Sequence, residues 1–207
     1  MISNKITKKE VEEAISNPIK IKGLALKEGL YKTLREKIGN DGVKILKEEV
    51  KSLGVPLPST EIKELEWYSA SIMIGTFFIL QEKFNFKEKD FAELGELAPK
   101  ISSTVRLLMK YFTIPEKIAK IAAPRLWKRF FNQGKVEVCK FKDSKTEGSL
   151  VVRIKDFKLH PLHFFYLGYY FLGITKLAKK FKEVKVKETK SPFRGDEYQE
   201  YLIRWKH

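Results

Sequence analysis

A regular alternation of apolar and polar residues begins at position 135, where the chain reads KVEVCKFKDSKTEGSLVVRIK (135–155). Two runs within it, 136–141 and 150–155, have a period of two residues, which is typical of strands with one face on a core. The polar segment 143–148 between them is short and contains a glycine. We therefore predict two antiparallel strands joined by a turn.

After this hairpin the sequence indicates a helix and two further strands. Residues 161–180 are apolar on almost every side, and a helix that is apolar all round is a buried one. Short alternating runs follow around Val184 and Val186 and again near the end, where Tyr201, Ile203 and Trp205 share one face. The order of elements from residue 135 is thus strand, strand, helix, strand, strand.

The first part of the chain shows helical periods instead. Thr7 and Glu10 have the spacing of a capping box, Gly39 is placed as a helix terminator, and residues 62–68 fit neither period. Pro124 is expected to kink or divide the last of these helices. The predicted helices are 7–15, 21–38, 41–53, 70–83 with Ser69 as cap, 87–96, 101–111, and 115–134 with Thr113 as cap.

These patterns predict an α+β protein with a single domain over residues 1–207. A helical part, 1–134, packs on an antiparallel sheet part, 135–207, which contains one buried helix. At 207 residues the chain can bury roughly 70% of its unfolded surface, so it needs neither a metal nor a disulfide to fold.

Few residues offer catalytic chemistry. Cys139 is alone, which excludes an internal disulfide, a zinc ribbon and a redox pair, and as a strand residue we expect it to be inert. The glycines form no phosphate cradle, and no Gly-x-Ser-x-Gly elbow occurs. We expect a protein that is not an enzyme.

Targeting signals are not recognised in the sequence. Residues 1–13 are polar and contain no apolar signal core. The weakly charged stretches 67–81 and 160–175 have about 15 residues, fewer than the roughly 20 that span a bilayer. We expect a cytoplasmic protein.

Positive charge is concentrated in the second half. Residues 1–100 hold 17 basic and 16 acidic residues, whereas 101–207 hold 24 and 10, a net charge of +14. Such a surface either keeps the protein in solution or binds an anionic membrane surface or nucleic acid. The candidate basic surface consists of Arg106, Lys110, Lys117, Lys120, Arg125, Lys128 and Arg129.

His160 and His163 stand three residues apart at the start of the buried helix, on one helix face. They could bind a metal or a haem iron, or act as acid and base, but a structural metal site needs three or four ligands. The alternative is that His160 lies at or just before the helix start and that His163 forms a hydrogen bond in the first turn.

Aromatic residues gather in 67–78, 111–131 and 164–171. A pocket among them, between the helices and the sheet, is the default ligand site, and the alternative is a solid core. We predict that a small apolar ligand or acyl chain binds there. The candidate ligand-binding residues are Trp67, Tyr68, Phe77, Trp127 and Tyr170.

The order of elements, with several short segments, resembles a known superfamily. The segments are Gly29-Leu30-Tyr31 through Gly39, Glu66-Trp67-Tyr68, Leu94-Gly95, Trp127 through Gly134, and Arg204-Trp205. The superfamily joins haem-nitric-oxide-binding domains, four-vinyl-reductase-type domains and TRAPP subunits, and the chain looks closest to a bacterial or archaeal branch of it. The resemblance implies a sensor-like regulatory domain with an apolar pocket, a homodimer and a regulatory partner protein.

The sequence departs from this superfamily at its cofactor motifs. The haem-binding members carry a histidine in the helical half and a Tyr-x-Ser-x-Arg motif, whereas here no histidine precedes His160 and that motif does not occur. The zinc-binding members carry several cysteines near the end, and here Cys139 is alone. We therefore expect no cofactor, neither haem nor zinc.

Overall fold

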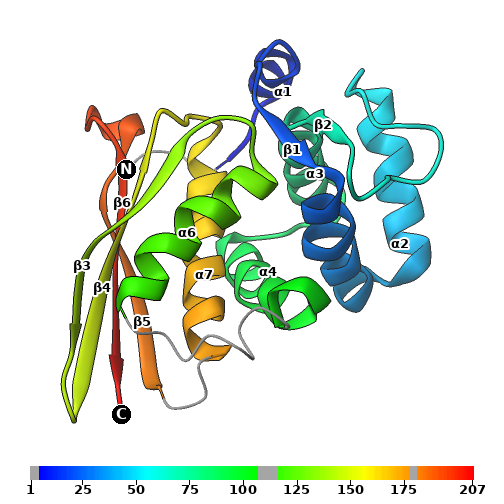
Figure 1. Ribbon diagram of the computed structural model, residues 1–207. Helices are drawn as coiled ribbons and strands as arrows, with labels where there is room; N and C mark the ends of the chain where they lie inside the picture. Colours follow the sequence, from blue (N-terminus) through cyan, green and yellow to red (C-terminus); the bar gives the residue numbers. More distant parts are fainter. Residues whose placement is uncertain (1–4, 107–115, 178–180) are drawn as a thin grey trace.

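The computed structural model describes residues 5–106, 116–177 and 181–207. Its main sheet has four antiparallel strands in the order β3-β4-β6-β5 (Figure 1). Their bounds are Lys135–Asp143 for β3, Glu147–Lys155 for β4, Lys182–Lys190 for β5 and Gln199–Lys206 for β6. The hairpin predicted from the alternation is confirmed, and Val138 stands opposite Val152 in its register.

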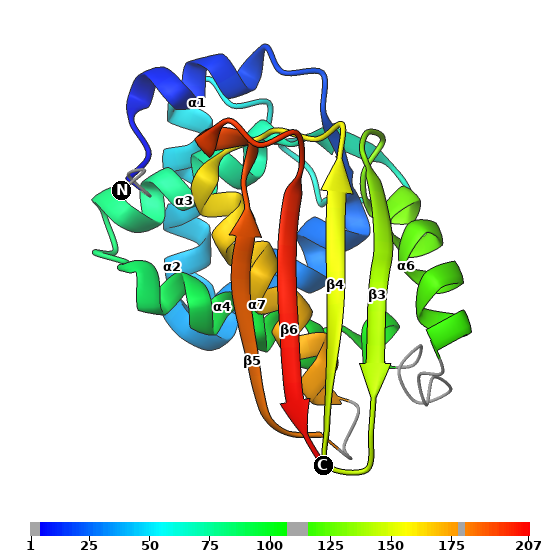
Figure 2. The ribbon, with the colours of Figure 1, turned by 90° about the vertical axis from the view of Figure 1, so that its left-hand side faces the viewer.

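The helices lie on one face of this sheet (Figure 2). The helix α7, Pro161–Leu177, packs directly against it, as its all-round apolar sequence predicts. Val136 and Ile154 face this helical layer from the first hairpin, and Tyr201 and Ile203 from β6; all four are buried. The α+β class and the order of elements are thus confirmed.

The first helix, α1 (Lys8–Ile15), begins as its sequence predicts. The Thr7 hydroxyl accepts a hydrogen bond from the Glu10 N–H at 3.3 Å, and the Glu10 carboxylate accepts one from the Thr7 N–H at 2.8 Å. This reciprocal pair satisfies two N–H groups that the helix start leaves without partners.

The prediction of a helix from residue 21 is wrong at its start. Residues Lys20–Lys22 form strand β1, which pairs with β2 (Trp67–Ser69); β2 begins within the stretch 62–68 that fits neither period. Gly23 follows at a point where a Cβ would come within 2.0 Å of the Lys63 carbonyl oxygen. This close approach of two chain segments is a tertiary contact, which local periodicity does not report.

Helical structure then runs from a π-helical turn, η1 (Ala25–Tyr31), into α2 (Lys32–Ser52). Gly39 breaks α2 with a φ of 70°, a conformation that glycine adopts without strain. The predicted interruption at this residue is confirmed.

The remaining helices are α3 (Ser71–Glu82), α4 (Glu88–Ile101) and α6 (Glu116–Phe130). Ala70, not Ser69, is the cap of α3, and α4 extends five residues beyond its predicted end at Glu96. Helix α6 continues through Pro124 and is not divided. The cap predicted at Thr113, the helix start predicted at Pro115, and residues 107–111 of the helix predicted over 101–111 lie outside the described residues.

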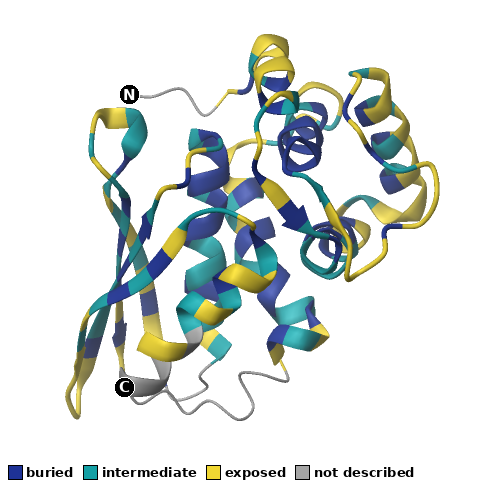
Figure 3. Ribbon diagram, turned by 45° about the horizontal axis from the view of Figure 1, so that its top comes forward, coloured by how far each residue is buried: buried dark blue, intermediate teal, exposed yellow. Residues whose placement is uncertain are grey.

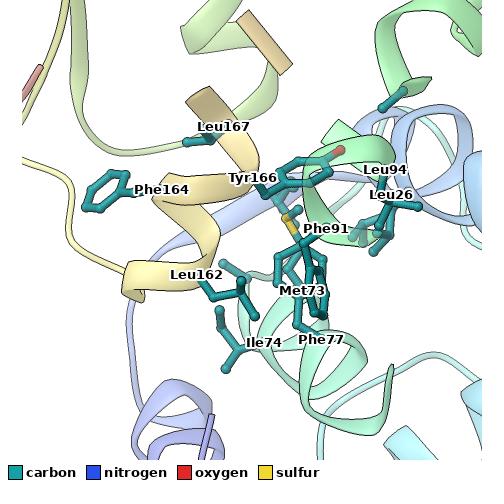
Figure 4. Close-up of a cluster of buried hydrophobic side chains, with 14 of the residues drawn as sticks. Leu26, Met73, Ile74, Phe77, Phe91, Leu94, Leu162, Phe164, Tyr166 and Leu167 are labelled. Atoms are coloured by element: carbon teal, nitrogen blue, oxygen red, sulfur yellow. The ribbon is translucent and has the colours of Figure 1, made fainter. Parts of the chain in front are cut away.

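Buried residues, dark blue in Figure 3, come from both parts of the chain and form one core. At its centre Phe77 of α3 packs edge-on to Phe91 of α4, with 5.1 Å between ring centroids, and lies 5.4 Å from Tyr166 of α7. Figure 4 shows these side chains with Met73 beside them. Among the described residues, no helix has both the length and the apolar character needed to cross a membrane.

Candidate ligand cavity

A cavity of about 200 Å³ lies between the helical part and the sheet. Its walls come from β1 and η1, from α6 and α7, and from the inner faces of β3, β4 and β6. Its lining is almost entirely apolar. The principal side chains are Ile21, Leu24, Met73, Val105, Leu126, Trp127, Phe130, Phe131, Val136, Val138, Leu150, Val152, His163, Tyr166, Leu167, Tyr170, Phe171, Ile174 and Ile203.

Two of the five predicted ligand-binding residues, Trp127 and Tyr170, line this cavity. The Trp127 indole stacks on Phe131 with 4.4 Å between centroids, and its N–H donates to the Gln133 carbonyl at 2.9 Å. Because the only polar atom of the indole is thus satisfied, Trp127 presents an apolar surface.

The other three lie elsewhere. Phe77 is in the core, and Trp67 is 39% exposed with the Lys22 ammonium 4.1 Å from its ring. The Tyr68 hydroxyl accepts a hydrogen bond from the Lys63 N–H at 2.9 Å. Contact between a ligand and any of the five residues stays a prediction.

The two histidines of α7 have different surroundings. His160 caps the helix: its Nδ1 accepts a hydrogen bond from the Leu162 N–H at 3.0 Å, and its Nε2 lies 3.4 Å from a Glu10 carboxylate oxygen, a contact without hydrogen-bond geometry. His163 is fully buried on the cavity lining. The hydrogen bond expected for His163 in the first turn does not form, and neither of its nitrogens has a partner among the described residues.

Burial dominates the electrostatics of both rings. It lowers the pKa of His163 to about 3, with a smaller contribution from His160, and it lowers the pKa of His160 despite the opposing effect of Glu10. Both imidazoles are therefore neutral near neutral pH, and a neutral imidazole has a nitrogen lone pair available.

Cys139 lies half-buried in β3, and burial raises the pKa of its thiol. A raised pKa disfavours the reactive thiolate. Within the described ranges, no group of three or more His, Cys, Asp and Glu side chains is placed to hold a metal ion.

The structure describes the side chains of five of the seven residues of the predicted basic surface. Arg106, Lys120, Arg125, Lys128 and Arg129 are exposed, the last four on α6. Lys110 and the side chain of Lys117 lie outside what the structure describes. A role for these residues at a membrane surface or on nucleic acid stays a prediction.

Comparison with known proteins identifies the fold. No family model and no curated protein matches the sequence. An oxygen-binding H-NOX domain related to soluble guanylate cyclases matches 89% of this chain and 94% of its own, with a TM-score of 0.62 and 20% identity. An H-NOX protein from S. oneidensis, solved in its Fe(II)NO state, matches 90% and 99%, with a TM-score of 0.64 and 9% identity.

The chain thus has the H-NOX fold, and the resemblance seen in the sequence is confirmed at the level of the fold. A further match, at 19% identity and a TM-score of 0.57, comes from work on haem redox potential and porphyrin distortion.

These matches overturn the expectation that the chain has no cofactor, because proteins with this fold include one studied for its haem redox potential and one solved in an Fe(II)NO state. The expectation rested on two missing motifs. Missing motifs do not exclude a nitrogen donor elsewhere in the cavity, and His163 offers one.

Proposed function

We propose that this protein is a cytoplasmic, non-enzymatic sensor domain that binds a small molecule in the cavity between its helices and its sheet. The observation that carries the proposal is the cavity itself, which is apolar and lined by elements from both parts of the chain. Homodimer formation, action through a regulatory partner protein and a single folding unit over 1–207 belong to the same proposal.

The size of the cavity sets the class of ligand. About 200 Å³ exceeds the roughly 150 Å³ of a buried cavity that binds benzene. It is below the roughly 300–1,000 Å³ of pockets that enclose drug-sized ligands. Small apolar molecules fit without rearrangement, while a larger flat molecule needs lining side chains to move, and Phe130 and Phe171 are only partly buried.

The groups that line the cavity fit haem. An apolar, aromatic lining suits the faces of a macrocycle, and His163 provides an unpartnered imidazole. Described lining residues carry no charge, so the carboxylates of haem would have to reach outside the lining; exposed Lys128 and Arg129 lie on the helix that contributes Leu126 and Phe130. Haem bound there would supply an iron that binds a diatomic gas. The protein would exclude water from it and hold it in place.

Native mass spectrometry of the freshly purified protein tests the proposal. We expect a mass excess that disappears on denaturation, or stoichiometric uptake of added hemin or of an added fatty acid. The variant Ala123→Phe places a ring in the cavity, because Ala123 belongs to its lining, and should reduce binding at least tenfold.

The control is Ile121→Phe, because Ile121 is 55% exposed on the same helix and is not part of the lining. This variant should bind as the wild type does. A wild-type protein that carries no ligand and takes up neither hemin nor fatty acid would refute the proposal, as would equal binding by both variants.

A further inference from the structure

The chain has three histidines, and two of them have polar partners. His160 accepts the Leu162 N–H and faces Glu10, as described above. His207, at the end of the chain, lies 2.8 Å from an Asp143 carboxylate oxygen through its Nε2. Each of these two rings has a structural explanation within the fold.

His163 has no such explanation. Its side chain is fully buried, and its surroundings are rings: Phe131, Phe157, Phe164 and Tyr166 have centroids between 5.7 and 6.4 Å away. A neutral imidazole has one N–H donor and one nitrogen acceptor. Leaving such a group buried and unpaired costs about 1–3 kcal/mol, and a buried group left in that state calls for a specific reason.

Metal coordination supplies such a reason. Neutral imidazole is a common ligand of iron, copper and zinc, and burial keeps His163 neutral down to a pH of about 3. A bare metal ion needs three or four protein ligands, and the described residues contain no cluster that could provide them. A metal in this cavity must therefore arrive with most of its ligands already attached.

A metal held in a flat macrocycle meets this condition, and its apolar faces match the aromatic lining. We infer that His163, from α7, is the protein ligand to the iron of a haem bound in this cavity. The inference rests on the proposed function, since it names the residue that holds the ligand. It also accounts for the histidine that the helical half lacks, because here the nitrogen donor comes from the helix that follows the first hairpin.

The test uses the full chain reconstituted with hemin. In the reduced wild-type complex, resonance Raman should show an iron–histidine stretch. His163→Gly should bind hemin at least tenfold more weakly, with a shifted Soret band and no such stretch. Addition of imidazole should restore the wild-type spectrum, because the small ligand can enter the space that the side chain left.

The matched control is His160→Asn, which retains a side chain able to cap the helix and should leave the spectrum unchanged. His163→Gln serves as a second variant of similar size if the glycine variant folds poorly, as judged by circular dichroism. A wild-type complex without an iron–histidine stretch, or a His163→Gly spectrum identical to the wild type, would overturn the inference.

The outcomes separate the two proposals. If hemin binds but the spectrum does not depend on His163, the sensor proposal stands and the ligand assignment is wrong. If hemin does not bind while a fatty acid does, the assignment is again wrong and the cavity function stands. If nothing binds, both are wrong.

Discussion

Helix α7 separates a filled region from a hollow one. On one side it packs against α3 and α4, where the rings of Phe77, Phe91 and Tyr166 lie within 5.4 Å of a neighbour's centroid. Toward α6 and the sheet, Tyr170 and Phe171 border the cavity, which Tyr166 reaches as well. The same helix, apolar all round, thus has two surfaces of similar composition and different packing.

Backbone contact explains the filled side. A Cβ at Gly95 would come within 2.5 Å of the Tyr166 carbonyl oxygen, and one at Gly173 within 2.5 Å of the Glu96 carbonyl oxygen. Two glycines, one on each helix, therefore let α4 and α7 approach closely. Toward the cavity, α7 presents the bulky rings of Tyr170 and Phe171.

The cavity on the hollow side has the chemistry to bind an apolar molecule. Its lining is almost entirely apolar, and removing apolar surface from water is favourable by roughly 25 cal/mol per Å². A small apolar ligand that covers this lining would therefore gain affinity from burial, whereas the filled side offers no such surface.

The largest loss of stability should come from a substitution on the filled side. Phe77→Ala removes a fully buried ring that contacts Phe91 and Tyr166, and should lower the free energy of unfolding by about 3–5 kcal/mol. Phe130→Ala, on the cavity lining and only partly buried, should cost less than about 2 kcal/mol. Urea denaturation of both variants measures the difference, and equal losses would contradict the distinction between the two regions.

Much of this fold is predictable from the sequence because local patterns carry it. The capping box at Thr7, the interruption at Gly39 and the alternating strands after residue 135 each depend on nearby residues. The strand β1 was not predictable in this way. Its pairing with β2 joins positions more than 40 residues apart, and the chain between them does not report it.

The existence of an aromatic pocket was predictable from the sequence, but the residues that line it were not. Aromatic clusters pointed to a pocket between helices and sheet, and Trp127 and Tyr170 do line it. Phe77 belongs to an equally aromatic cluster, yet it fills the core. Which side of a helix is filled depends on the fit of neighbouring elements. For His163 a signal was present, a polar residue in an all-apolar helix, but its missing partner is visible only in three dimensions.

The hollow side should also make stability depend on pH in the haem-free protein. His163 has a pKa of about 3 in the folded protein against 6.5 ordinarily, because burial, and then His160, disfavour the charged ring. Below pH 6.5 the unfolded chain binds a proton that the folded protein does not. Stability is therefore complete above that pH and falls toward pH 3, by up to about 1.4 kcal/mol per pH unit.

Between pH 7 and pH 5 the loss from His163 should reach roughly 2 kcal/mol by the same relation. The titratable groups near it are His160, which Glu10 faces, and Tyr166, whose pKa burial raises far above this range. His163→Phe should flatten the profile of urea midpoint against pH, leaving the weaker contribution of His160. An unchanged slope in this variant would show that His163 is solvated and not enclosed.

The smallest expected change in stability comes from replacing one glycine in each region. Gly95→Ala should destabilise by at least about 1 kcal/mol, because its Cβ meets backbone that cannot easily move. Gly29 borders the cavity within η1, and a Cβ there meets nothing within 4 Å. Gly29→Ala should therefore stabilise the ligand-free protein by about 0.5–1 kcal/mol, the gain expected for alanine over glycine in a helix. Thermal unfolding of the two variants should shift in opposite directions, and a shift in the same direction would mean that packing at η1 is as tight as between α4 and α7.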